Sequence, residues 1–324
     1  MPTQNQRINP AASSHSHDAA DSIDPGEQSG FRGARLSATV ILLRDGVGGL
    51  EVWMQERVLS MPNYPGITVF PGGGVDSRDF PPRSWDDGEL WLGRSAISLA
   101  RQLGVTKYKA HALMFAAVRE LFEETGTLLA VDDDGVLLDD ARPFHDHRLK
   151  LESHELSLTD VLRESNLNVC ADLVKPLARW VGKSESGNWF DTFTFVAANP
   201  EGQEPDSNTE EADDANWFPP QLILEGWRHG LVRLAPSTWA QLNEVARFED
   251  AEEALAAAWR ADLSPVVGDP VDDLRYHDFF SFTPITKVPS TSLPGADRST
   301  FLAPASRCAL ALGPVVKKPV HSIT

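Results

Sequence analysis

Four charged residues lie within six positions of one another in the stretch AAVRELFEETGTLL: Arg119, Glu120, Glu123 and Glu124. The spacing of the three Glu residues, i, i+3 and i+4, places their carboxylates on one flank of a helix. Like charges near a helix C-terminus are unfavourable by roughly 0.3–1 kcal/mol each. Such a face is either simply solvated or balanced by a cation. Because carboxylate oxygens suit hard divalent cations, the pattern predicts a site for Mg²⁺ or Mn²⁺.

The helix that must position these carboxylates is indicated by its apolar spacing of i, i+3, i+4 and i+7. Gly126 follows where the helix should end. The three glutamates are expected to lie beside the buried stripe and outside the core. That stripe consists of Ala110, Leu113, Met114, Ala117, Val118 and Leu121.

A second motif, FPGGGVD at residues 70–76, lies upstream of RELFEETG at residues 119–126. Together they resemble the Nudix box, whose family pattern is G-x5-E-x7-R-E-U-x-E-E-x-G-U, with U a bulky aliphatic residue. Thr127 departs from the pattern at the final U. The matching residues are Gly73, Arg119, Glu120, Leu121, Glu123, Glu124 and Gly126.

The two halves of this box are far apart in the sequence. Gly73 and Arg119 are separated by 46 positions, 32 more than in the family pattern, and His111 stands where the first Glu is expected when counting back from Arg119. A split box is similar to the peroxisomal coenzyme A diphosphatase-like branch of the superfamily. The resemblance to that branch spans about residues 37–260, although Trp189 stands where the branch commonly has an Arg. It includes the segments FDTFTFVA, NWFPPQLIL and LAPSTWAQLNEVARF.

The elements around the box predict an α+β fold. Strand-like segments such as SATVILLRD, LEVWMQER and DTFTFVAA mix with helical ones without strict alternation. The resemblance implies a Nudix-type α/β/α sandwich on a mixed β-sheet, with an insertion in the Nudix box and extra C-terminal helices. We predict a disordered N-terminal tail over residues 1–34, a Nudix hydrolase domain over 35–262 with an insertion at about 77–110, and a largely irregular C-terminal extension over 263–324.

The resemblance also assigns roles to the residues of the box. It implies that Glu120, Glu123 and Glu124 hold the metal ions, and Arg119 is expected to orient these carboxylates. Gly72, Gly73 and Gly74 would shape the turn beside the helix. The general base is either Glu120 or Glu211, and Glu211 is equally well explained as a solvated member of the acidic stretch TEEADD.

The predicted reaction is hydrolysis of the diphosphate linkage of a nucleoside diphosphate derivative, with coenzyme A or an acyl-coenzyme A as the first choice. Arg57, Gly66 and residues 70–73 match a coenzyme A diphosphatase motif, whose second Arg falls on Pro62. The insertion carries a net charge of +2 and could face a 3′-phosphate or form an ordinary mixed-charge surface. Its aromatic residues either pack on the domain or stack on a base. They are Trp85, Trp91 and Tyr108.

Alternatives at the level of function remain open. ADP-ribose, NADH and dinucleoside polyphosphates compete as substrates, and a catalytically silent metabolite sensor is a second class. The formal net charge of −18 argues against nucleic acid as a partner, and no apolar run of about 18 residues predicts a membrane span. With only Cys170 and Cys308, no disulfide framework is indicated, and we expect a cytoplasmic protein. The oligomeric state is left open, a homodimer being one option.

Overall fold

The structure is a computed structural model that describes residues 28–58, 66–82, 85, 89–184, 186–207 and 212–282, with the backbone alone at 212 and 213. The described part begins inside the predicted N-terminal tail. There η1 (Phe31–Gly33) is held by the Phe31 N–H, which donates to the buried Asp191 carboxylate at 2.7 Å. Residues 28–34 therefore contact the domain, although the sequence placed them in the tail.

A mixed β-sheet forms the centre of the molecule. Its strand order is β10-β2-β1-β9-β8-β11, with parallel pairing between β1 and β9 and between β8 and β11, and antiparallel pairing elsewhere. A smaller sheet has the order β5-β7-β6. The strands of the main sheet are β1 (Arg35–Gly46), β2 (Gly49–Arg57), β3 (Thr68–Val69), β4 (Gly72–Gly74), β8 (Lys175–Lys183), β9 (Trp189–Ala198), β10 (Ala212–Phe218) and β11 (Val266–Val267). Those of the small sheet are β5 (Trp91–Leu92), β6 (Ala130–Val131) and β7 (Asn168–Cys170).

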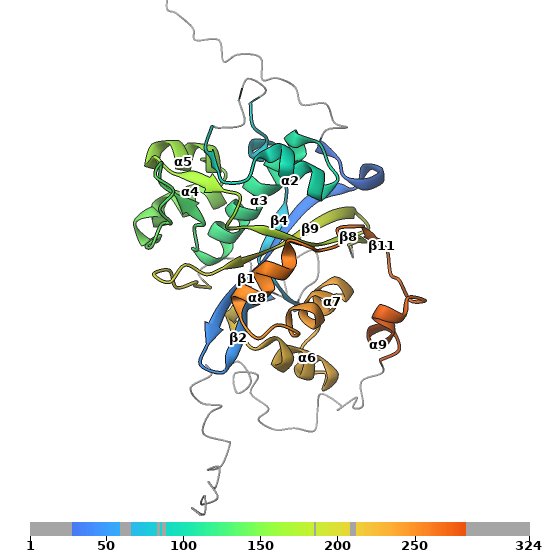
Figure 1. Cartoon of the computed structure of the whole chain (residues 1–324). Helices are drawn as coiled ribbons and strands as arrows, with labels where there is room; N and C mark the ends of the chain where they lie inside the picture. The colour runs from blue at the N-terminus through green and yellow to red at the C-terminus, as the bar shows by residue number, and fades with distance from the viewer. Residues whose placement is uncertain are drawn as a thin grey trace, which may run out of the picture.

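Helices cover both faces of the main sheet, as Figure 1 shows. Alternate residues of β1 enter two separate cores: Leu42 contacts the core on the α3 side, and Leu43 contacts the core on the α7 side. This alternation is what a strand buried on both faces requires. The helices on one side are α2 (Ala96–Leu103), α3 (Lys107–Thr125), α4 (His145–Glu152) and α5 (Leu158–Ser165), and those on the other are α6 (Pro220–Arg228), α7 (Pro236–Val245) and α8 (Ala251–Ala258).

The predicted α+β class and the α/β/α sandwich are confirmed by these layers. Two short helices, α4 and α5, fall between β6 and β7, where no element was predicted, and are introduced by the 3₁₀ turn η3 (Arg142–Phe144). The predicted C-terminal extension contains β11, the turn η4 (Leu274–Tyr276) and α9 (His277–Phe280). Phe279 stacks on Trp227 of α6 with ring centroids 5.4 Å apart, so the described part of the extension packs on the domain.

The helix α3 is buried almost all round: the six residues of the predicted apolar stripe are completely buried, and burial extends beyond that stripe to most of the other residues. All its residues are buried except Lys107, Tyr108, Lys109 and Glu123. Its C-terminus ends at Gly126, which adopts the left-handed conformation with φ +74°, as the sequence predicted. The Arg148 guanidinium donates to the Glu123 carbonyl at 3.0 Å, which supplies a cation to the negative end of the helix.

The insertion folds against the outer side of α3. It contains η2 (Ser77–Asp79), β5 and α2, and Leu99 of α2 is completely buried. Its aromatic residues pack on the protein: Trp91 stacks on His111 at 5.2 Å, and Tyr108 lies 5.1 Å from Phe80. Of the two options for these rings, the described residues therefore show packing on the domain.

The main sheet forks where the site lies. The start of β1 pairs with β4 through Ser37 to Thr39, whereas its end pairs with β2 from Leu43 onward. The strand β2 in turn pairs with β3 at Gln55 and Glu56. Because β1 and β2 diverge here, a glycine-rich turn enters between them, and the C-terminal half of α3 reaches this opening.

Candidate functional site

A cavity of about 690 Å³ lies at the fork of the sheet. This volume is in the range of ligand sites for nucleotide-sized molecules. Its walls come from the glycine turn, the end of α3, the neighbouring strands β8 and β9 and the first turn of α7. Seven of the predicted site residues line it: Arg57, Gly72, Gly73, Arg119, Glu120, Glu123 and Glu124.

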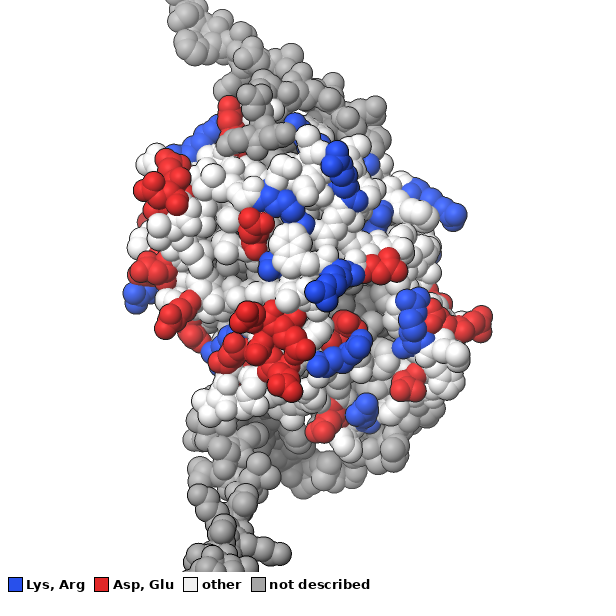
Figure 2. Space-filling view, viewed as in Figure 1, with Lys and Arg blue, Asp and Glu red and all other residues white. Residues whose placement is uncertain are grey.

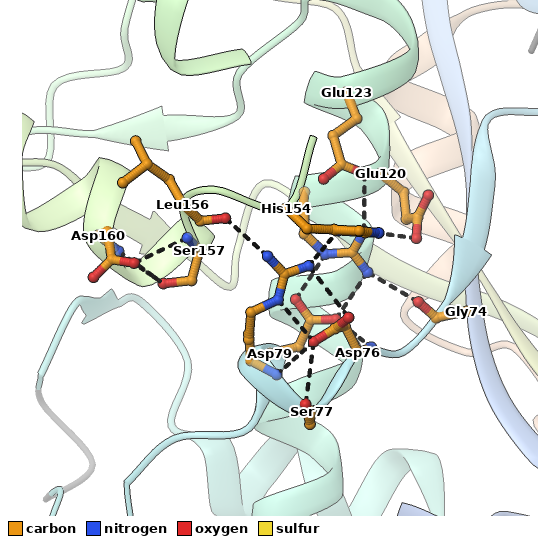
Figure 3. A network of polar contacts seen from close by, with 12 residues as sticks. Gly74, Asp76, Ser77, Asp79, Glu120, Glu123, His154, Leu156, Ser157 and Asp160 are labelled. Carbon is orange, nitrogen blue, oxygen red and sulfur yellow. Dashed lines mark hydrogen bonds and ion pairs between the residues drawn. The ribbon is translucent and has the colours of Figure 1, made fainter. Parts of the chain in front are cut away.

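Arg119 is the centre of the polar network at this site. Figure 3 labels its partners Gly74, Asp79, Glu120 and Glu123. Its Nη1 group lies 2.8 Å from Glu120 and 2.9 Å from Glu123, and its Nη2 group donates to the Gly74 carbonyl at 2.9 Å. The guanidinium is 4% exposed, so these charge-assisted contacts are made in a low-dielectric environment. The arrangement is the one expected of a residue that orients the carboxylates.

Asp79 is a site residue that the sequence interpretation missed. Both its carboxylate oxygens accept from Arg119 at 2.8 Å, in a bidentate pair that is almost completely buried. Asp79 stands six positions after Gly73, which is the position of the first Glu in the Nudix pattern when it is counted forward from the glycine. Counting back from Arg119 led to His111, which instead stacks on Phe115 in the core at 4.2 Å. The extra residues thus follow this acidic position.

Glu124 corrects the expectation that all three glutamates lie outside the core. Its side chain is 4% exposed, and its Oε2 atom accepts from the Gln55 amide and, at 3.1 Å, from the Gly72 N–H. Glu120 is also buried, at 8% exposed. The reason is that α3 turns this flank toward β2 and the glycine turn rather than toward solvent.

The glycine turn approaches the glutamates too closely to carry side chains. A Cβ atom on Gly73 would lie 2.6 Å from both carboxylate oxygens of Glu120. Gly72 has φ +154° and a Cβ there would lie 2.4 Å from the Ala38 carbonyl oxygen. The predicted role of these two glycines in close backbone approach is consistent with this geometry.

Burial controls the electrostatics of the glutamates. Desolvation raises the pKa of Glu120 to about 8, against the opposing effect of Arg119, and it also raises the pKa of Glu123. Burial alone would lower the pKa of Arg119, but Glu120, Asp79 and Glu123 hold it above its ordinary value. Arg119 is therefore a permanent cation in direct contact with three carboxylates, more than its single charge neutralises.

One carboxylate oxygen at the site is suited to bind a divalent cation. The Oε1 atom of Glu123 is buried and has no hydrogen-bond partner among the described residues, whereas its Oε2 atom is bound to Arg119. A buried carboxylate oxygen without a partner is costly and is a ligand atom for Mg²⁺ or Mn²⁺. Within the ranges that the structure describes, however, no three His, Cys, Asp or Glu side chains converge as a preformed metal site. Binding would require the carboxylates to turn toward one another.

The structure describes Arg57 but not Glu211. Arg57 ends β2 and lines the cavity, and its carbonyl accepts from the Gly66 N–H at 3.0 Å, next to the FPGG turn. Arg57, the first residue of the predicted motif, thus lies in the wall of the same cavity as the glutamates. Glu211, the second candidate for the general base, lies outside the described residues.

Two further residues near the site, His154 in the loop after α4 and Arg78 in η2, were indicated by no sequence motif. Arg78 donates to the Leu156 carbonyl at 3.0 Å and lies 2.5 Å from His154 Nδ1, and His154 lines the cavity. His154 has φ +63°, an uncommon conformation for a non-glycine residue. Burial would raise the pKa of Asp76, but hydrogen bonds from Arg78 lower it to about 2. Arg78 thus links this loop to Asp76, which follows the glycine turn; Figure 3 labels its partners Asp76, His154 and Leu156.

Comparisons with known proteins agree with the fold. No family model and no curated protein matches the chain. A solved NUDIX hydrolase from Alicyclobacillus acidocaldarius is similar, with a TM-score of 0.59 and 27% sequence identity over 71% of this chain and 97% of that chain. The NUDIX domain of Shewanella oneidensis NrtR, solved with ADP ribose, has a TM-score of 0.37 and 15% identity over 70% of this chain and 93% of its own, too low to support an argument. The structure therefore has the fold of Nudix hydrolases.

Proposed function

We propose that this enzyme, a hydrolase of phosphorus-containing acid anhydrides with a Nudix fold, cleaves the diphosphate linkage of coenzyme A or an acyl-coenzyme A with the help of Mg²⁺ or Mn²⁺. The observation that carries the proposal is the cavity at the fork, where Glu120, Glu123 and Glu124 meet Arg119 and the glycine turn. The choice of coenzyme A is supported by Arg57 and Phe70, which belong to the matched motif and line this same cavity.

The three glutamates would hold the metal ions. The chemistry that such a cation would supply is neutralisation of phosphoryl oxygens and a more acidic water molecule. Arg119 fixes the orientation of Glu120 and Glu123, and the pair with Asp79 fixes Arg119 itself. The role of the chain is thus to hold a dense set of carboxylates in place despite their mutual repulsion.

The general base is proposed to be Glu120. It lines the cavity together with Glu123 and Glu124, which puts its carboxylate beside the space that the substrate and the attacking water would occupy. Glu211 remains the alternative base. The variant that decides is Glu211→Gln, because Glu211 is not among the proposed metal ligands. A loss of kcat as large as that of Glu120→Gln would assign the base to Glu211, and kcat near that of the wild type would leave Glu120 as the base.

The test of the proposed function is a hydrolysis screen of the purified full chain. The panel contains coenzyme A, acetyl-coenzyme A, ADP-ribose, NADH and dinucleoside polyphosphates, each with Mg²⁺, with Mn²⁺ and with excess EDTA, and products are identified by mass. We expect hydrolysis of coenzyme A or its ester to be fastest and to stop in EDTA. Preference for another member of the panel would contradict the substrate, and full turnover in EDTA would contradict the metal.

The glutamate assignment has its own controls. Glu123→Gln and Glu124→Gln should each lower kcat by roughly 100-fold or more while circular dichroism stays unchanged. If the wild type binds these metabolites without hydrolysing any, the alternative of a silent Nudix-fold sensor is supported instead. We also propose the domain limits 35–262 and a cytoplasmic location; among the described residues no helix has the length and apolarity to cross a membrane.

A further inference from the structure

The first turn of α7 lines the same cavity as the glutamates. Ala235, Pro236, Ser237 and Thr238 all contribute to its wall. Ala235 is the N-cap residue and adopts an extended conformation, with φ −74° and ψ 155°, that is typical of a cap. Its methyl group cannot accept a hydrogen bond, and no side chain caps this helix.

Two backbone donors remain at this helix start. Pro236 occupies the first helical position and has no N–H, and the Trp239 N–H donates to the Ala235 carbonyl at 3.0 Å. The N–H groups of Ser237 and Thr238 make no hydrogen bond to another described residue. The N-terminal end of a helix also carries a partial positive charge. An uncapped end that faces a cavity is suited to an anionic group.

The Thr238 side chain is a second and independent observation. It is 7% exposed and lines the cavity, and its hydroxyl group has no hydrogen-bond partner in the described part of the chain. The hydroxyl oxygen is not among the fully buried unpaired atoms of the described residues, so it is open to the cavity, where a ligand can complete its bonding. One turn farther along α7, the Gln241 amide donates to the Thr194 hydroxyl at 2.6 Å, so this end of the helix is fixed to β9.

We propose that the first turn of α7, with the N–H groups of Ser237 and Thr238 and the Thr238 hydroxyl, binds a phosphate group that the substrate carries in addition to its scissile diphosphate. Lys183 of β8 lines the same cavity and adds a positive charge, and Asp269 adds a negative one. The inference rests on the proposed function, because it assigns the glutamates to the scissile diphosphate. It names a substrate class: diphosphates with a further phosphate.

Two sources of such a phosphate can be separated with matched substrates. Coenzyme A and 3′-dephospho-coenzyme A differ by one phosphate monoester on the ribose. Diadenosine tetraphosphate and diadenosine diphosphate differ by the length of the phosphate chain. A preference within the first pair assigns the subsite to a monoester, and a preference within the second pair assigns it to the phosphate chain.

The deciding variants are Thr238→Val and Ala235→Asp, assayed in the full chain with Mg²⁺. Thr238→Val removes the hydroxyl and keeps the shape, so kcat/KM for the phosphate-rich member of the responding pair should fall about tenfold or more, while the other member changes less than about twofold. Ala235→Asp caps the free N–H groups and repels an anion. It should abolish the preference while the melting temperature stays the same or rises.

The matched control is Thr159→Val. Thr159 lies in the first turn of α5 and does not line the cavity, so this variant should retain the preference. The inference is overturned if the wild type shows no preference within either pair. It is also overturned if Thr238→Val and Ala235→Asp lower both members by the same factor.

A binding measurement separates failure of this inference from failure of the proposed function. Calorimetry compares adenosine 3′,5′-bisphosphate with AMP, and inorganic tripolyphosphate with pyrophosphate, in the wild type and in Ala235→Asp. If nothing is hydrolysed but the wild type prefers the phosphate-rich ligand of one pair and the variant does not, the proposed function fails and the subsite stands. Equal affinities within both pairs would overturn the subsite whatever the activity.

Discussion

At the scale of single residues, the site depends on one buried cation among several carboxylates. Arg119 contacts Asp79, Glu120 and Glu123, and all three contacts are between 2.8 and 2.9 Å. These pairs are not equivalent. Asp79 is 1% exposed and gives both oxygens to Arg119, whereas one oxygen of Glu123 has no partner among the residues that the structure describes. Asp79 therefore holds the arginine in place, and Glu123 is available for a metal ion.

Removing Asp79 should destabilise the fold because Arg119 would remain as a buried charge without its bidentate partner. We expect Asp79→Ala to lower the free energy of unfolding by about 3–5 kcal/mol, measured by urea denaturation. The control is Asp140→Ala, which removes a carboxylate bound to Arg142 in a similar geometry at the exposed surface. That variant should change stability little, and equal losses in the two variants would contradict a special role for Asp79.

Glu120 should make the stability of the metal-free protein depend on pH. Burial raises its pKa in the folded state from the ordinary 4.5 to about 8, so the folded chain holds a proton that the unfolded chain has lost. This contribution is complete below about pH 4.5 and is lost as pH rises toward 8. In EDTA, the melting temperature of the wild type should fall relative to that of Glu120→Gln between pH 6 and 8.5. A constant difference between the two proteins would refute this pKa.

At the scale of elements, the glycine turn and α3 must fit together closely. Gly73 and Gly74 are neighbours in β4, but a Cβ atom on Gly73 would meet the Glu120 carboxylate, whereas one on Gly74 meets nothing within 4 Å. The obstacle at Gly73 is the end of a flexible side chain. A methyl group there should therefore displace Glu120 rather than unfold the chain.

This difference predicts the outcome of two alanine substitutions. Gly73→Ala should lower kcat on the order of 100-fold by moving Glu120, with little change in melting temperature. Gly74→Ala should have a much smaller effect, since its side chain points into open space. Steady-state kinetics with Mg²⁺ and thermal melts of both variants provide the measurement. Comparable losses of kcat in the two variants would show that the close approach of Gly73 to Glu120 does not cause the loss.

The insertion is the second element whose role the structure revises. The sequence left open whether it faces a 3′-phosphate or forms an ordinary mixed-charge surface. Apart from its first residues it lies against α3, and none of its described residues lines the cavity. Trp91 is buried, at 4% exposed, and so is unavailable for stacking on a base. The described part of the insertion therefore packs against α3 and supports this helix.

A support role predicts a loss of stability without a change of specificity. Leu99→Ala in α2 should lower the free energy of unfolding by about 2–5 kcal/mol, because Leu99 is completely buried. Ile97→Ala, in the same helix but 43% exposed, should cost less than about 0.5 kcal/mol. The ratio of kcat/KM between coenzyme A and ADP-ribose should be the same in both variants as in the wild type. A changed ratio in Leu99→Ala would restore a recognition role for the insertion.

At the scale of the whole molecule, the chain is acidic overall, and its acidic side chains also gather locally on the surface. The chain carries a formal charge of −18, and on the face in Figure 2 acidic side chains gather near the centre, with Lys and Arg dispersed among them and no broad basic surface. Divalent cations will therefore be attracted to the protein in general. A test of metal binding must therefore distinguish a specific site from this general attraction.

Metal binding at the glutamates should stabilise the folded protein beyond the general effect of charge. Saturating Mn²⁺ should raise the melting temperature of the wild type, and the double variant Glu123→Gln/Glu124→Gln should lose most of that rise. The control, Glu225→Gln/Glu252→Gln, removes the same two charges from exposed positions on α6 and α8 and should keep it. If both double variants respond alike, the cation acts through net charge alone.

Much of the fold and of the candidate site could be predicted from the sequence because the information is local. Strand alternation, the apolar period of α3 and the cap at Gly126 are set by neighbouring residues. The Nudix-like spacing likewise placed Glu120, Glu123 and Arg119 on one helix. These features need only the geometry of a single element.

What the tertiary structure alone decided involves contacts between distant segments. Asp79 meets Arg119 across 40 positions of sequence, and Gln55 meets Glu124 across 69, so neither pair follows from a helical or strand period. The first turn of α7 reaches the cavity from more than 100 positions beyond the glutamates because both helices pack on one forked sheet. Burial, which sets the pKa of Glu120 and turns Glu124 inward, is likewise a property of the packed layers and not of the spacing of the residues.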